Sequence, residues 1–177
     1  GFKGLKLRLG RENPRQDLAT LVAVKKAVGE DLRLMVDFNQ ALSVHEAIRR
    51  GRMIDAEGGV AWIEEPIRAD DFEGCAKVAD EVGTPIQIGE NFMGPEQMAQ
   101  AIAMQCCDYV MPDAQRIGGV TGWMKAAAMA EAFNLPIVSH VMPEMLVHVV
   151  AAAPNGLTVE YMPWMLALYE ETPKVEK

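Results

Sequence analysis

Three acidic residues end three successive apolar segments of this 177-residue chain. Asp37 follows Leu-Met-Val, Glu64 follows Val-Ala-Trp-Ile, and Glu90 follows Ile-Gln-Ile-Gly. They lie 27 and then 26 residues apart, about the length of one strand–helix unit. A carboxylate at the end of a buried strand costs free energy unless its charge is compensated, and a hard divalent cation is the usual compensation. The spacing therefore predicts a divalent metal site at the carboxyl ends of parallel strands.

Other polar residues also end the expected strands. A single residue of this kind would be typical of a solvated strand end, but its recurrence on consecutive strands indicates a shared site. Lys6 and Arg8 are two residues apart, so their side chains face the same side of one strand, and the same parity aligns Asp37 with Asn39. The full set of polar strand-end candidates, besides the three acids, is Lys6, Arg8, Asn39, Glu65, Asn91, Asp113, His140 and Glu160.

Short β-type runs alternate with amphipathic helical segments along the whole chain. This alternation predicts a parallel α/β fold. Strands are expected at residues 4–9, 32–38, 60–64, 85–90, 109–112, 136–140 and 157–161. Helices are expected at residues 17–28, 44–52, 71–82, 95–104, 121–133 and 145–152.

Two parallel architectures fit this alternation, a doubly wound sheet and a (β/α) TIM-type barrel. The barrel is favoured because its active sites collect residues from many strand ends. A doubly wound sheet usually places a glycine-rich turn after its first strand, and Gly118-Gly119 lacks the rest of that motif. Seven strands fall short of eight, so we expect an incomplete barrel from which an N-terminal piece is missing. Residues 1–177 would then form one partial catalytic domain.

The composition fits an ordinary globular protein, because half of the residues are apolar and 24% are charged. The net charge of −8 and the lack of a basic stripe argue against nucleic-acid binding. Cys75, Cys106 and Cys107 show no CxxC spacing and are interpreted as buried thiols in a reducing compartment. Neither a signal peptide nor a long apolar run is present, so no membrane association and a cytoplasmic location are expected.

Taken together, the strand-end residues resemble the barrel domain of the enolase superfamily, specifically its mandelate racemase subgroup (the mandelate racemase and muconate lactonizing enzyme relatives). The resemblance implies that the chain forms strands two to eight of the family's barrel, and that the first strand and an N-terminal capping domain lie outside it. It also implies that Asp37, Glu64 and Glu90 bind Mg²⁺. Spacing alone does not separate Glu64 from Glu65, and the resemblance selects Glu64. The matching segments cover nearly the whole chain and are residues 6–8, 36–40, 62–66, 89–91, 111–113, 117–123 and 139–140, and Glu160.

The resemblance also implies the chemistry. The proton α to the carboxylate of a hydroxy acid would be removed, and Mg²⁺ and a cation would stabilise the resulting enediolate. Lys6 would hold the substrate carboxylate, Glu160 would donate a hydrogen bond to it, and Asn39 would contact the substrate. The Asp113–His140 pair resembles the family dyad, in which the aspartate orients the imidazole base.

Arg8 departs from the family pattern, because mandelate racemase has a second lysine base at this position. An arginine is protonated under essentially all conditions and is a poor proton acceptor. Arg8 would instead clamp a substrate oxygen or carboxylate, leaving His140 as the principal base. One-base chemistry suits dehydration, so an acid-sugar dehydratase (a lyase) is favoured over a 2-hydroxy-acid racemase or epimerase (an isomerase).

A different class of function is a non-catalytic relative that binds acidic ligands. Retention of all three acids and of the Asp113–His140 pair argues against it. We expect a small hydroxy-carboxylate as the ligand and a homo-oligomer for the full-length protein. Trp164 follows the last strand, where packing and a pocket-lining role are equally compatible with the sequence.

Overall fold

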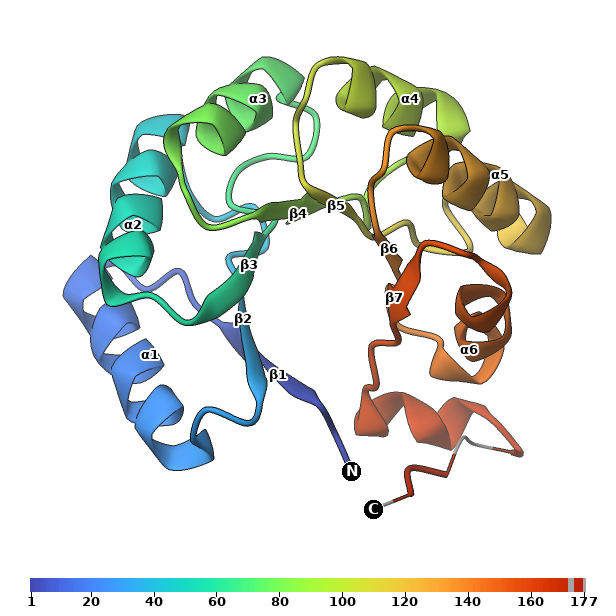
Figure 1. The fold of residues 1–177 in the computed structure, drawn as a ribbon, viewed down its shortest axis with the longest axis horizontal. Helices are drawn as coiled ribbons and strands as arrows, with labels where there is room; N and C mark the ends of the chain where they lie inside the picture. Colours follow the sequence, from blue (N-terminus) through green and yellow to red (C-terminus); the bar gives the residue numbers. More distant parts are fainter. Residues whose placement is uncertain (172–173, 177) are drawn as a thin grey trace. The chain divides into compact units, whose positions relative to one another are not determined.

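The structure, a computed structural model, describes residues 1–171 and 174–176, except for the side chains of residues 164–166. These residues form seven strands that alternate with six α-helices and end in a 3₁₀ helix (Figure 1). The strands are β1 (Gly4–Arg8), β2 (Arg33–Asp37), β3 (Val60–Glu64), β4 (Ile86–Ile88), β5 (Tyr109–Val110), β6 (Ile137–Val138) and β7 (Gly156–Thr158). The helices are α1 (Pro14–Val28), α2 (Val44–Glu57), α3 (Phe72–Glu81), α4 (Pro95–Ala103), α5 (Gly119–Ala132), α6 (Pro143–Ala152) and η1 (Pro163–Leu168).

The strands are hydrogen-bonded in chain order, from β1 to β7. The pairs β1–β2, β2–β3, β3–β4, β5–β6 and β6–β7 are parallel. A doubly wound sheet reverses its strand order at a switch point, and no reversal occurs here. The topology is therefore that of a (β/α) barrel, as the sequence predicts.

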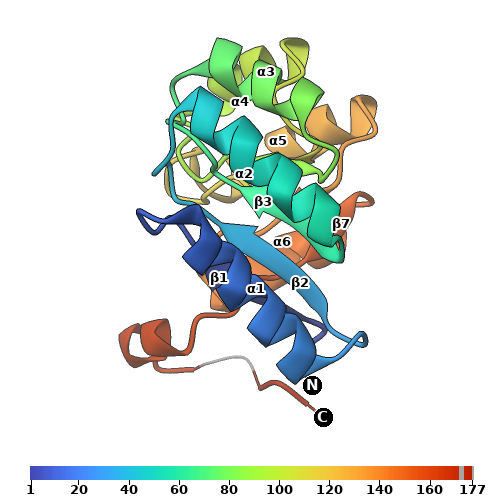
Figure 2. The same cartoon turned by 90° about the vertical axis from the view of Figure 1, so that its left-hand side faces the viewer.

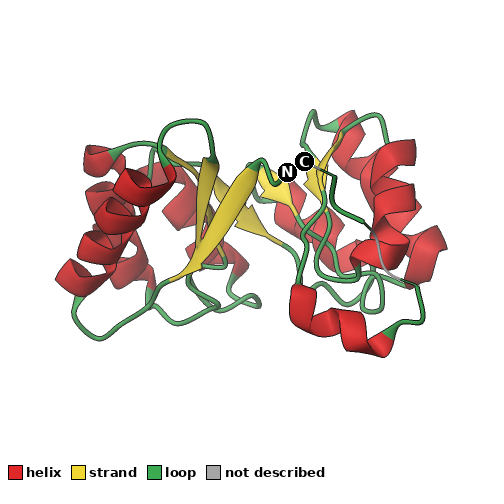
Figure 3. Ribbon diagram, turned by 90° about the horizontal axis from the view of Figure 1, so that it is seen from below, coloured by secondary structure: helices red, strands yellow, loops and turns green. Residues whose placement is uncertain are grey.

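The chain divides into two compact units. The first unit is Gly1–Gln87 and the second is Ile88–Glu176. In the first unit, α1 and α2 lie side by side over the same face of the strands (Figures 1 and 2). In the second unit, α5 packs against α4 and α6, and the strands are short segments between long loops (Figure 3).

Capping residues explain where the helices of the first unit begin. Asn13 precedes α1, its side chain accepts a hydrogen bond from the Arg15 N–H, and Pro14 occupies the first turn, where its missing N–H costs nothing. Helix α1 therefore begins at residue 14, earlier than the predicted residue 17. Ser43 caps α2 in the same way through the Glu46 N–H.

Helix α2 continues to Glu57, beyond the predicted end at residue 52, and it passes through Gly51. A glycine inside a helix costs about 1 kcal/mol relative to alanine. Gly51 is buried, and a Cβ atom built on it would lie 2.5 Å from Cγ2 of Val82, the C-cap residue that directly follows α3. Close packing of α2 on the end of α3 thus requires a residue without a side chain at position 51.

The later strands are shorter than predicted, so Glu90, Asp113, His140 and Glu160 lie in loops just beyond them. Strand β4 ends at Ile88 because Gly89 has a φ of +137°, outside the extended region. A single parallel bridge between Asp113 and His140 continues the pairing of β5 and β6. The prediction that these four residues end strands is therefore wrong in detail, although each follows the expected strand.

The core of each unit is apolar. Leu21, Val36 and Ile63 are buried in the first unit, and Trp123 and Leu146 in the second. The three cysteines are buried and form no disulfide, as predicted. None of the described helices combines the length and the apolar character needed to cross a bilayer.

Candidate active site

In the first unit, Lys6 on β1 reaches across β2 to Glu64 at the end of β3. Its Nζ atom donates to both carboxylate oxygens, at 2.7 Å to Oε1 and 2.8 Å to Oε2. The Glu64 side chain is 0% exposed, so its charge is removed from water. The ammonium group supplies the positive charge that a buried carboxylate requires.

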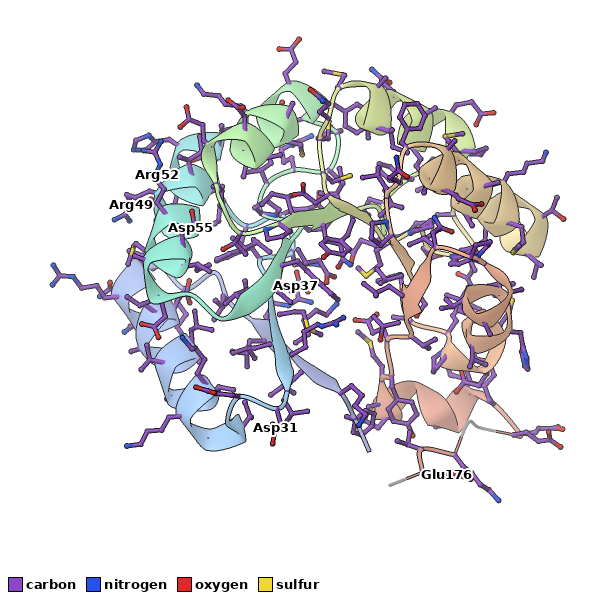
Figure 4. All side chains as sticks on the ribbon, in the orientation of Figure 1. Asp31, Asp37, Arg49, Arg52, Asp55 and Glu176 are labelled. Carbon is purple, nitrogen blue, oxygen red and sulfur yellow. The ribbon has the colours of Figure 1, made fainter. Side chains whose placement is uncertain are left out.

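Arg8 forms a second cation–carboxylate pair two residues further along β1. Its Nη2 atom lies 3.0 Å from Asp37 Oδ2, and the Asp37 side chain is 3% exposed, whereas that of Arg8 is 59% exposed. Asp37 Oδ1 accepts a hydrogen bond of 2.7 Å from the Asn39 N–H. Figure 4 shows Asp37 on the side of the strands away from α2, whose Arg49 and Arg52 point outward.

The register of the strands explains why these groups share one face. Arg8 pairs with Asp37, Asp37 with Glu64, and Glu64 with Gln87. Side chains at paired positions of neighbouring parallel strands point to the same side of the sheet. Lys6 lies two positions before Arg8 and therefore points to that side as well.

In the second unit, His140 lies between two carboxylates. Its Nδ1 atom lies 2.8 Å from Asp113 Oδ2, and its Nε2 atom lies 3.2 Å from Glu90 Oε2. The other oxygen of Asp113 accepts hydrogen bonds from the backbone N–H groups of Gln115 and Arg116. These hydrogen bonds hold the Asp113 carboxylate in place, and Asp113 in turn holds the Nδ1 atom of the His140 imidazole.

These contacts shift the pKa values of His140 and Asp113. Burial alone would lower the pKa of His140, but the hydrogen bonds to Asp113 and Glu90 and the charges of Glu90 and Glu160 outweigh it and raise that pKa to about 9. Burial alone would raise the pKa of Asp113, but hydrogen bonds from His140 and Arg116 hold it below its ordinary value. Without a metal, the imidazole is therefore protonated at neutral pH.

Glu160 is held beside the loop that follows β6. Its Oε2 atom accepts a hydrogen bond of 2.8 Å from the Val141 N–H, and its own N–H donates to Ser139 Oγ at 2.7 Å. Val141 and Met142 have φ values of 42° and 46°, a left-handed conformation that a β-branched residue rarely adopts. The Glu160 carboxylate thus helps to hold a strained turn directly after His140.

Comparison with known proteins identifies the family. The family described as enolase C-terminal domain-like matches residues 1–176. The chain belongs to the enolase superfamily. Its fold is accordingly an incomplete α/β barrel of that superfamily, and the resemblance to the mandelate racemase subgroup is confirmed.

The chain is similar to several proteins of the enolase superfamily that are described as dehydratases or enolases. The chain is 36% identical to the L-talarate/galactarate dehydratase of Salmonella typhimurium, over 97% of this chain and 43% of that protein. It is similar to the crystal structure of an enolase from alpha pretobacterium bal199 with bound Mg, with 46% identity, a TM-score of 0.95, and coverage of 99% and 48%. The L-talarate dehydratase of Polaromonas sp. JS666, complexed with Mg and L-glucarate, has 36% identity, a TM-score of 0.93, and coverage of 99% and 49%. The chain thus spans about half the length of these enolase-superfamily relatives.

Three residues near these groups were not singled out from the sequence. Arg116 Nη1 donates to the Glu90 carbonyl at 2.8 Å and to Asn91 Oδ1 at 3.0 Å, so it holds the loop that carries Glu90. Ser139 positions Glu160 through its hydroxyl group. Gln87 is a fully buried amide in β4. Of these three residues, only Gln87 could have been identified from the sequence, because a polar residue interrupts the apolar run of its strand.

The donor groups suit the Mg²⁺ of enolase-superfamily proteins. Asp37 and Glu64 are buried carboxylates that already face cationic groups, and hard oxygen ligands are those that Mg²⁺ prefers. Among the described residues, no group of three or more His, Cys, Asp or Glu side chains is gathered as a metal site. Asp37 and Glu64 belong to the first unit and Glu90 to the second, so the set of three ligands stays a prediction. The side chain of Trp164 lies outside the described residues.

Proposed function

We propose that this chain is the catalytic part of a Mg²⁺-dependent enzyme that removes the proton α to the carboxylate of a hydroxy acid, and that it acts as an acid-sugar dehydratase. The orientation of His140 supports this function best. Its Nδ1 atom is held by Asp113, and its Nε2 atom lies against Glu90, a proposed metal ligand. An imidazole fixed in this way presents one nitrogen to a substrate bound beside that ligand.

The proposed roles of the other residues follow from their charge and from their positions at the strand ends. Mg²⁺, when bound by Asp37, Glu64 and Glu90, supplies Lewis-acid stabilisation of the negative charge on the substrate carboxylate. Lys6 holds the same carboxylate as a cation, and Glu160 donates a hydrogen bond to it when its own carboxyl group carries a proton. Asn39 follows Asp37 at the same strand end and contacts the substrate.

Arg8 favours dehydration over racemisation, because a guanidinium group does not serve as a second base. His140 takes the α-proton, and Arg8 clamps a substrate oxygen. The protonated imidazole returns a proton to the β-hydroxyl group, which leaves as water, and the enol that remains tautomerises to a 2-keto acid. The similarity to the talarate/galactarate and arabinonate dehydratases is consistent with this reaction. Similarity to the L-Ala-D/L-Glu epimerase of Clostridium acetobutylicum, at 32% identity, favours racemisation or epimerisation as the second candidate.

We further propose that residues 1–177 act as one catalytic domain, that the full-length protein is a homo-oligomer, and that it works in the cytoplasm. The three buried thiols without a disulfide support a reducing compartment. Light scattering of the purified full-length protein tests the oligomeric state.

Proton exchange in deuterated water tests the proposed function. The full-length protein is incubated with Mg²⁺ and a panel of acid sugars and 2-hydroxy acids, and α-deuterium and 2-keto acid are measured. A dehydratase forms a 2-keto acid, whereas a racemase abolishes optical rotation without forming one. No exchange and no product from any acid, in a protein that still binds one of them, would establish the non-catalytic alternative.

The rate of the variant H140N tests whether His140 is the base. Loss of a general base costs about 100-fold or more in rate. His148 is exposed on α6, so H148N is a matched control that should retain the wild-type rate. Equal rates for the two variants would remove His140 from the mechanism.

A further inference from the structure

Gln87 has a buried amide that no residue in the described part of the chain satisfies. Its side chain is 0% exposed, and neither Oε1 nor Nε2 has a hydrogen-bond partner there. Buried polar groups in native proteins are nearly always hydrogen-bonded, so an exception requires an explanation. Its neighbours on β4, Ile86 and Ile88, are apolar, and a methionine of the same length would fill the same space without an unpaired amide.

The position of Gln87 places this amide beside the buried acid Glu64. The two residues are register partners on the neighbouring parallel strands β3 and β4. Their side chains therefore point to the same face, with their strands about 4.8 Å apart. The backbone hydrogen bonding is consistent with this register, because the Glu65 N–H donates to the Gln87 carbonyl at 3.0 Å.

Lys6 holds both oxygens of Glu64, at 2.7 Å and 2.8 Å. Under the proposed function, Glu64 would bind Mg²⁺ and Lys6 would hold the substrate carboxylate. The second oxygen of a metal-bound carboxylate needs a hydrogen bond to keep its orientation, and such outer partners strongly affect metal affinity. Gln87 has the donor and the position to provide this bond.

We propose that Gln87 is a positioning residue for Glu64: its Nε2 group takes over from Lys6 as the hydrogen-bond donor to that carboxylate when Mg²⁺ binds. This inference rests on the proposed function. It explains why an amide is kept among apolar residues at the expense of stability in the metal-free protein. Lys6 would thus hold the Glu64 carboxylate in the metal-free protein, and Gln87 would hold it when Mg²⁺ is bound.

Mg²⁺ binding to the full-length protein, measured by titration calorimetry without substrate, tests this assignment. The variant Q87M keeps the volume and removes the amide. It should bind Mg²⁺ about tenfold more weakly than the wild type, whereas Q100M, at an exposed glutamine of α4, should bind it unchanged. In EDTA, Q87M should be at least as stable to urea as the wild type, because it no longer buries an unpaired amide.

The wild-type protein provides a second readout that needs no variant. The side-chain NH₂ signal of Gln87, assigned by through-bond NMR, should shift when Mg²⁺ is added. Equal Mg²⁺ affinity of Q87M and wild type, or an NH₂ signal that does not respond to Mg²⁺, would overturn the role of Gln87 alone. A wild-type protein that binds no Mg²⁺ would overturn the proposed function and this role with it.

Discussion

At the scale of single residues, Asp113 and Glu90 determine the charge of His140. With a pKa of about 9, the imidazole is charged at neutral pH in the metal-free protein. Mg²⁺ bound at Glu90 would withdraw one of the two carboxylates that favour the charged form. The pairing of His140 with Glu90 thus couples the availability of the base to metal binding.

The variant D113N should lower the pKa of His140 in EDTA, because it removes a negative charge in direct contact with the imidazole. Histidine titration by NMR measures this shift. D31N is a suitable control, since Asp31 is exposed and belongs to the other unit. An unchanged pKa in D113N would show that Asp113 does not stabilise the imidazolium.

The same pKa predicts how stability depends on pH. The pKa of His140 is raised in the folded state, so its stabilising contribution is complete below the unfolded value of about 6.5 and is lost as pH rises through about 9. In EDTA, the free energy of unfolding of the wild type should therefore decrease from pH 6.5 to 9 more steeply than that of D113N. Parallel pH profiles from urea unfolding would contradict this.

At the scale of elements, a buried ion pair joins α1 to α2 in the first unit. Arg50 Nη1 lies 2.5 Å from Asp17 Oδ2, with side chains that are 7% and 5% exposed. Asp17 also accepts hydrogen bonds from the N–H groups of Gly10 and Arg11. This network fixes the loop that connects β1, the strand of Lys6 and Arg8, to α1.

The variant R50Q should lower the free energy of unfolding by about 3 kcal/mol, because it removes the buried cation of Asp17 and leaves only the half-exposed Arg11, 3.6 Å away. Arg49, the neighbouring residue, binds the same Glu46 but is about half exposed. R49Q should therefore change stability by less than about 1 kcal/mol. Urea unfolding of the two variants makes the comparison, and similar losses would show that burial of the pair is unimportant.

The elements also show what the sequence could predict. Alternation of apolar runs and the strand-end polar residues were sufficient for the barrel topology, because both signals are local. The predicted helix at residues 44–52 already included Gly51, but its continuation to Glu57 was not predicted, because the packing of α2 against Val82 is a tertiary contact that the local sequence does not show. The hydrogen bonds of Arg116 were missed for the same reason, since its partners Glu90 and Asn91 lie 26 and 25 residues away.

At the scale of the whole molecule, the candidate chemistry is divided along the chain. The first unit contributes Lys6, Arg8 and two acids, and the second contributes Glu90, the Asp113–His140 pair and Glu160. In the first unit, the cationic side chains already compensate the buried acids. Folding of the protein should therefore not depend on Mg²⁺.

The variant K6M tests this compensation. In EDTA it should lose about 3 kcal/mol of stability, because the buried Glu64 loses the ammonium group that donates to both of its carboxylate oxygens. About 10 mM Mg²⁺ should recover part of this loss and should stabilise the wild type less. Thermal unfolding with and without Mg²⁺ gives both values, and K3M, at an exposed lysine near the same strand, is the control. A K6M protein as stable as wild type in EDTA would contradict the compensation.

The close approach of α2 to the end of α3 has a consequence for the evolution of the family. Position 51 has no room for a methyl group while position 82 is valine. Relatives that carry alanine or a larger residue at position 51 should therefore carry alanine or glycine at position 82, so the two positions should covary. Substitutions at these two sites would then be accepted mainly in pairs, which limits the mutational routes open to this part of the barrel.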